Sequence, residues 1–104
     1  MEDKVKTELK LRIRQFLNYY DTIEIELRNT LFQNNHLLTF HIEQINKSLN
    51  LDNSLTLHYL LESFIYLENN LLYDNLKTEN YNFRGIYLIL SEIIRLIRLL
   101  LKLN

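Results

Sequence analysis

The sequence of 104 residues contains no cysteine, proline, tryptophan or alanine, and it contains a single glycine. Without cysteine the chain cannot form a disulfide framework, a thiolate metal site or a cysteine nucleophile. One glycine and no proline exclude a glycine-rich phosphate-binding loop, a dinucleotide-binding fingerprint and a turn-rich β-sandwich. The longest apolar run, Ile86–Leu90, is far shorter than the roughly 18–20 residues that span a bilayer. The sequence therefore offers no candidate for a membrane-spanning helix.

Leucine and isoleucine dominate what is present, with 35 residues between them, and asparagine contributes 13. The apolar fraction of 47% is typical of a globular domain and too high for a disordered chain. Alanine, glycine and proline have GC-rich codons whereas asparagine, isoleucine and lysine have AT-rich ones, so we interpret the bias as that of an AT-rich genome. The length predicts one domain over residues 1–104. Because the charged start Met1–Lys4 leads into no apolar leader segment, we expect a soluble, cytoplasmic protein.

Apolar residues recur at alternating steps of three and four along most of the chain, which is the pattern of amphipathic helices. The first stripe fails at Asn34 and Asn35 and restarts in a new phase, which predicts either a break or a kink in one continuous helix. Capping residues in Asn50–Ser54 predict a turn, and the polar stretch Lys77–Gly85 predicts the second loop. The expected helices cover residues 3–32 and 36–49, then a stretch that begins after a cap at Asp52, Asn53 or Ser54 and ends near 75, and finally 83 or 86 to 103.

We therefore predict an all-α fold: a small antiparallel bundle of three or four helices, in which the first two form a long helical hairpin. A brief apolar–polar alternation over Thr22–Leu27 would also suit a strand, but the longer helical pattern around it favours a helix. The apolar stripes give the expected core, namely Leu9, Ile13, Phe16, Ile23, Leu27, Leu38, Ile42, Ile45, Leu57, Leu60, Phe64, Leu67, Ile86, Ile89, Ile93 and Ile97.

The last expected helix is apolar over most of its circumference, with its polar side chains confined to one narrow face. A surface helix needs an apolar stripe of only about 100°, so this helix must be central in the bundle or covered by a second copy, a partner or a membrane. A domain of this length rarely has enough interior to hide such a helix completely. We therefore expect a homodimer or a protein partner to contact its apolar flank, which comprises Leu88, Leu96, Leu99 and Leu103.

Charge is unevenly distributed, although the net charge is only −1. Both ends of the chain are basic and the middle is acidic, so phosphates of a nucleic acid are one possible target of the basic residues. Glu8 lies four residues before Arg12, where the two can form an ion pair along a helix. A solvated, ion-paired face is the favoured interpretation. The alternative, a nucleic-acid interface, would use Lys4, Lys6, Lys10, Arg12, Arg14, Arg95, Arg98 and Lys102.

Candidate groups for catalysis or metal binding are few. The best metal geometry is His58 with Glu62, one helical turn apart, but a zinc site needs three or four protein ligands. Tyr59, Tyr66 and Tyr73 recur every seven residues and could stack bases, although we expect them to border the core with their hydroxyls in water. We expect no metal, no cofactor and no enzymatic activity. The sequence predicts a small helical interaction protein, such as an adaptor, an inhibitor or an immunity-type factor, with nucleic-acid binding as the alternative.

Overall fold

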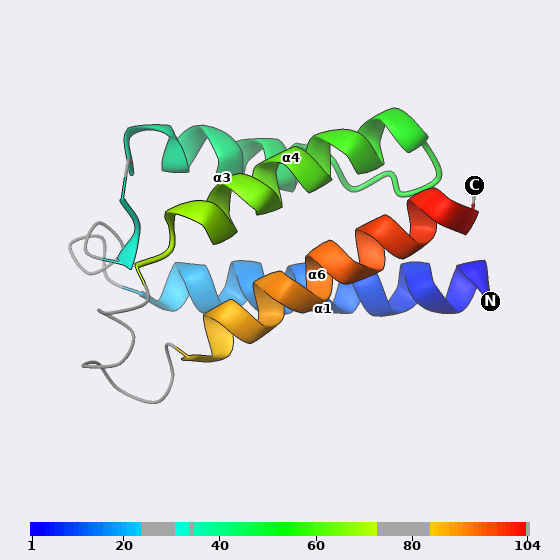
Figure 1. Ribbon diagram of the computed structural model, residues 1–104, viewed down its shortest axis with the longest axis horizontal. Helices are drawn as coiled ribbons and strands as arrows, with labels where there is room; N and C mark the ends of the chain where they lie inside the picture. The colour runs from blue at the N-terminus through cyan, green and yellow to red at the C-terminus, as the bar shows by residue number, and fades with distance from the viewer. Residues whose placement is uncertain (24–30, 34, 73–83, 104) are drawn as a thin grey trace.

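The computed structural model describes residues 1–23, 31–33, 35–72 and 84–103 (Figure 1). These ranges contain the α-helices α1 (Glu2–Thr22), α3 (Leu38–Lys47), α4 (Ser54–Asn70) and α6 (Arg84–Leu103), and the 3-10 helix η1 (Asn35–Leu37). The bundle measures 40 × 25 × 20 Å. The predicted all-α bundle is confirmed.

Helix α6 lies between α1 and α4, and α3 packs against α4 (Figure 1). The α6 side chains Ile86, Ile93 and Ile97 face the bundle, as expected, together with Leu100. None of the four is more than 2% exposed. The central position explains why α6 is apolar over so much of its circumference, because two neighbouring helices cover it. The helical hairpin is formed by α3 and α4 rather than by the first two helices, and α1 packs mainly on α6.

Helix α1 is shorter than the periodicity predicts, since it ends at Thr22 and not near residue 32. Ile23 adopts an extended backbone, and the Thr22 hydroxyl donates to the carbonyl of Tyr19 at 2.7 Å. Thr22 and Ile23 are both β-branched, and such residues lose side-chain freedom in a helix. Local backbone chemistry therefore ends the helix even though the apolar spacing continues. The expected core residue Leu27 lies outside the described residues.

Helix α4 also ends earlier than predicted, at Asn70 rather than near Asn75. The Asn70 side-chain amide donates to the carbonyl of Tyr66 at 2.8 Å, a contact that competes with the regular helical pattern. Leu71 is extended and forms an isolated antiparallel bridge with Phe32. The second loop was expected over residues 77–85, and its positions up to 83 lie outside the described residues. Its last two positions, Arg84 and Gly85, belong to α6, which begins at Arg84.

The core follows the predicted apolar stripes closely. Every expected core residue that the structure describes is buried, except Ile42 and Ile89, which are half buried against the core. The rings of Phe16 and Phe64 meet edge to face with their centroids 5.7 Å apart and join α1 to α4. Aromatic pairs in this geometry add stability beyond the area that they bury.

Two contacts hold the turn between α3 and α4 close to the start of α4. The Asn53 side chain caps α4 by accepting the Leu55 backbone N–H at 2.8 Å, as the capping residues predict. The Lys6 ammonium on α1 donates to the Asp52 carboxylate at 2.6 Å, so the turn is tied to the first helix. The hydrogen bond raises the pKa of Lys6 and lowers that of Asp52.

Candidate protein interaction site

The apolar flank of α6 is less open than the sequence suggests. Leu88 is 66% exposed and Leu103 is 41% exposed, whereas Leu99 is half buried. The expectation that Leu96 lies on an open flank is wrong, because this side chain is 3% exposed and belongs to the core. The cause is the central position of α6, whose buried arc is wide enough to include Leu96.

The exposed leucines of α6 do not form one continuous surface. Leu88 and Leu99 are about three turns apart on the same face of the helix. Glu92 and Arg95 lie between them and form an ion pair with an N···O distance of 2.5 Å. A charged pair therefore interrupts the flank that was expected to contact a second copy.

Within the described part of the chain, three of the eight cationic candidates have a carboxylate partner. Lys6 contacts Asp52, Arg95 contacts Glu92, and Arg12 contacts Glu8 at 2.9 Å, as its spacing predicts. The other five, Lys4, Lys10, Arg14, Arg98 and Lys102, are exposed.

The paired groups also act across the α1–α6 seam. Hydrogen bonding to Arg95 lowers the pKa of Glu92, and the positive charge of Arg12 on α1 lowers it further. The bond to Glu92 in turn raises the pKa of Arg95, with a smaller contribution from Glu8. Charges of opposite sign on α1 and α6 therefore face each other across the seam.

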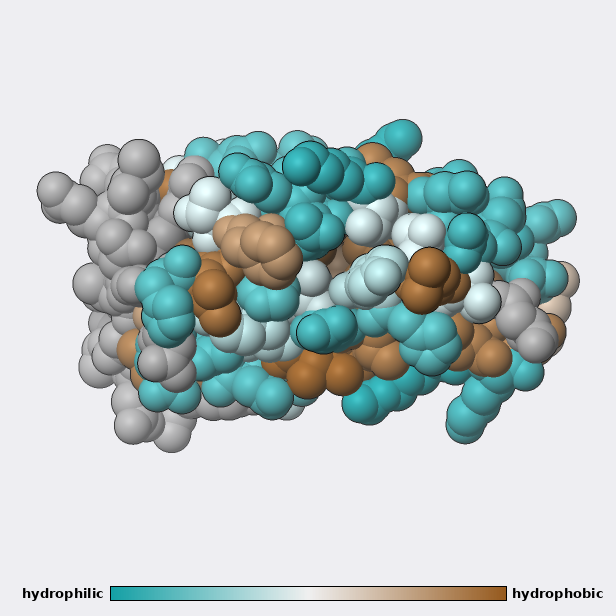
Figure 2. Space-filling view, turned by 90° about the horizontal axis from the view of Figure 1, so that it is seen from above, coloured by the Kyte–Doolittle hydropathy of each residue, from teal (hydrophilic) through white to brown (hydrophobic). Residues whose placement is uncertain are grey.

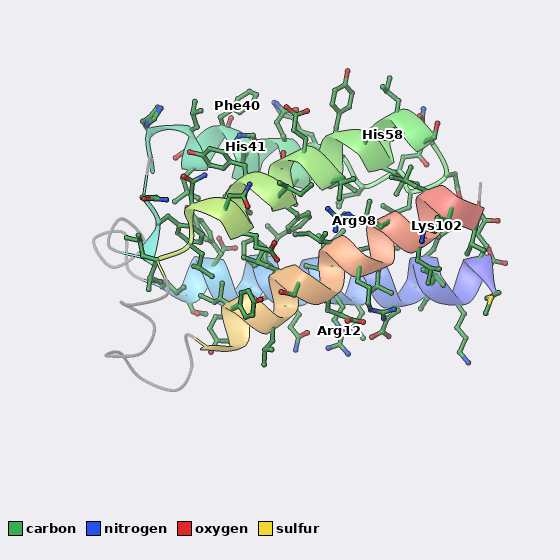
Figure 3. The ribbon with its side chains drawn as sticks, viewed as in Figure 1. Arg12, Phe40, His41, His58, Arg98 and Lys102 are labelled. Atoms are coloured by element: carbon green, nitrogen blue, oxygen red, sulfur yellow. The ribbon has the colours of Figure 1, made fainter. Side chains whose placement is uncertain are left out.

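A shallow groove of about 380 Å³ runs between α4 and α6. Arg98 and Lys102 border it near the C-terminal end of α6 (Figure 3). Glu68 of α4 lines the same groove and accepts the Ser91 hydroxyl hydrogen bond at 3.2 Å. The groove is therefore basic at one end, with an acid opposite.

A second pocket, of about 230 Å³, opens on the outer side of the α3–α4 hairpin. Its lining includes two large rings, Phe40 of α3 and Tyr59 of α4, which are 52% and 53% exposed. We call the exposed side chains Leu37, Phe40, Leu55 and Tyr59 the α3–α4 face. Figure 2 looks onto this side of the molecule, where hydrophobic side chains stand among hydrophilic ones.

The floor of this pocket contains a buried polar pair. His41 and Ser63 are 8% and 3% exposed, and His41 Nδ1 lies 3.0 Å from the Ser63 hydroxyl oxygen. The imidazole stacks on Tyr66 at a centroid distance of 4.2 Å, and Phe40 meets it edge to face at 5.2 Å. Figure 3 shows Phe40 and His41 together beside α3. The rings and the hydrogen bond hold the imidazole in one orientation.

Burial lowers the pKa of His41, and the nearby negative charge of Glu62 opposes this effect only in part. The imidazole is therefore neutral at neutral pH, and one of its nitrogens is satisfied by Ser63.

A serine beside a histidine could in principle act as a nucleophile and its base. Ser63 lies in the middle of α4, where backbone N–H groups bond to carbonyls one turn earlier. Such a position offers no pair of backbone donors for a developing oxyanion. We therefore interpret the pair as a satisfied polar contact that fixes α3 against α4.

Sequence reasoning missed this pocket because its two halves are far apart in the chain. His41 and Ser63 are 22 residues apart, and nothing in either segment points to the other. One signal was available. Phe40 lies two positions from both Leu38 and Ile42, so this ring falls on the side of the helix opposite the core stripe.

Among the described residues, no helix is both long and apolar enough to cross a bilayer. In the same part of the chain, no three histidine or acidic side chains are grouped so that they could share a metal ion. Comparison with models of known families, with curated proteins and with solved structures found no match to this chain.

The buried histidine predicts a pH-dependent stability. Because its pKa is lowered in the folded state, the unfolded chain takes up the proton first as the pH falls below about 6.5, and the contribution of neutral His41 is then lost. Urea unfolding at about pH 7.5 and about pH 5 should show a smaller loss of unfolding free energy for His41→Gln than for the wild type. The control is His58→Gln, since His58 is exposed on α4. Equal pH dependence of the two variants would contradict the assignment.

Proposed function

We propose that the chain is a small, non-enzymatic interaction protein, of the adaptor, inhibitor or immunity type, which binds a protein partner through the α3–α4 face. The observation that carries the proposal is the exposure of Phe40 and Tyr59, which are each more than half open to solvent and line the same pocket. Aromatic residues are enriched in protein interfaces and dominate their binding energy where they adjoin a pocket.

The positions of these two rings on their helices support the same function. Phe40 is followed by the buried His41, and Tyr59 is followed by the buried Leu60. Each ring therefore projects from a helix whose other side is fixed in the core. Because an aromatic side chain has only two rotatable bonds, it loses little freedom when a partner covers it, which lowers the cost of binding.

The experiment distinguishes a different protein from a second copy of the chain as the partner. Partners cross-linked in the native host are identified, purified and titrated against wild-type protein and Phe40→Ser/Tyr59→Ser. We expect the double variant to raise the Kd by about 100-fold, since two hot-spot residues at about 1–2 kcal/mol each give this factor. A self-associating protein should show the same change in its dimer dissociation constant, measured by sedimentation.

The matched control is Leu88→Ser, because Leu88 is an exposed apolar residue on α6, away from the α3–α4 face. It should change the Kd by less than about threefold. A partner that binds the double variant as tightly as the wild type would show that this face is not the interface. A protein that stays monomeric and binds no purified protein partner would overturn the proposal.

Nucleic-acid binding is the second candidate, and one observation favours it. The N-terminus of α1 and the C-terminus of α6 lie at the same end of the bundle (Figure 1), so basic residues from both chain ends come near one another. Such binding would weaken steeply with salt and would depend on Arg98 and Lys102 rather than on Phe40. The proposal ranks second because Lys6, Arg12 and Arg95 already pair with carboxylates.

A further inference from the structure

We propose that the pocket between Phe40 and Tyr59 receives an arginine side chain of the protein partner. This inference rests on the proposed function and specifies the chemistry of the partner at one position. The remaining lining residues, His41, Gln44, Glu62 and Ser63, come from the same two helices.

The size of the pocket suits a side chain. Its volume of about 230 Å³ is below the roughly 300–1,000 Å³ of pockets that enclose small-molecule ligands and cofactors. A single long side chain that enters from the surface would fill such a space. The pocket opens on the exposed side of the α3–α4 hairpin, where the rest of a partner segment would lie.

The charge of the pocket selects a cation. Among the described residues that line it, Glu62 is the one acidic side chain, and no lysine or arginine lines it. His41 sits beneath, is held against Ser63, and carries no charge at neutral pH. An anionic side chain would meet the Glu62 carboxylate without a compensating cation, whereas a cationic one would form a charge-assisted hydrogen bond.

The aromatic walls favour a guanidinium over an ammonium. Cations bind over the faces of aromatic rings, and the planar guanidinium can also stack on them while it bonds a carboxylate with two N–H groups. Phe40 and Tyr59 provide the rings, and Glu62 provides the acceptor. The side-chain oxygen of Gln44 is a further acceptor at the pocket wall. An ammonium has no plane to stack and would use these groups less completely.

The test is an NMR titration of the full chain with N-acetyl-arginine methylamide. We expect saturable shifts of the ring resonances of Phe40, His41 and Tyr59. The isosteric citrulline amide, which is neutral, should bind at least about tenfold more weakly, because it lacks the charge-assisted bond. The lysine amide should also bind more weakly. Equal binding of citrulline would overturn the role of charge, and equal binding of lysine would overturn the choice of guanidinium.

A matched pair of variants locates the site. Glu62→Gln should weaken binding of the arginine amide by about tenfold. Glu43→Gln removes the same charge from an exposed position on α3 outside the pocket lining and should change binding by less than about twofold. Equal effects would mean that the probe senses only the general field of the hairpin, and the pocket assignment would fail. If the arginine amide does not bind although the partner complex still depends on Phe40 and Tyr59, the inference is wrong and the proposed function stands.

Discussion

Leu96→Glu is expected to unfold the protein, whereas Leu88→Glu is expected to leave it folded. Leu96 is 3% exposed between packed helices, and Leu88, eight residues earlier on α6, is 66% exposed. A carboxylate buried without a partner costs several kcal/mol, which is comparable with the roughly 5–15 kcal/mol that stabilise a whole domain. Circular dichroism and urea unfolding of both variants would measure the difference.

The pair separates two arrangements of α6. If Leu96 instead contacted a second copy of the chain, the glutamate variant would be a folded protein of reduced mass, and the packing of α6 between α1 and α4 would be wrong. Loss of folding at Leu88 as well would show that both leucines are buried within one chain.

Leu9→Ala should lower the free energy of unfolding by about 2–5 kcal/mol, and Leu11→Ala should change it by no more than about 0.5 kcal/mol. The two leucines stand two residues apart on α1, but Leu9 is fully buried and Leu11 is 57% exposed. Removing the buried side chain loses its transfer free energy and leaves a cavity. The comparison is well matched because helix, residue type and substitution are the same.

Urea unfolding of both variants, analysed with a common m-value, would measure the two changes in unfolding free energy. Similar small losses would mean that the apolar stripe of α1 does not face the core. Similar large losses would mean that Leu11 is covered as well, for example by another copy of the chain.

The core residues could be predicted from the sequence because apolar spacing indicates directly which face of a helix is buried. Leu9, Ile13 and Phe16 follow that spacing and are all buried. The helix ends were less readable, because local hydrogen bonds of Thr22 and Asn70 decide them and the apolar pattern runs on past both. Propensities of single residues act within one turn, whereas periodicity is averaged over several.

The arrangement of the helices and the interaction site depend on contacts between distant segments. The burial of Leu96 follows from the position of α6 between two helices, which the sequence of α6 alone does not specify. The contact between His41 and Ser63 requires α3 to lie beside α4 in one alignment. The outward placement of Phe40 was the part of the site that periodicity could indicate in advance.

The charges on α1 and α6 affect the alignment of one helix along the other. The core between these helices consists largely of leucines and isoleucines, which are similar in size and shape. A slip of one helix along another by one turn keeps the same apolar face of each helix toward its neighbour, so the apolar pattern does not by itself exclude it. Such a slip of about 5.4 Å would move Arg95 from the neighbourhood of Glu8 toward Arg12, or Glu92 from Arg12 toward Glu8. Either shift replaces attraction by repulsion between like charges. The four charged groups therefore favour the observed alignment over its one-turn neighbours, by the small amounts that exposed charge pairs contribute.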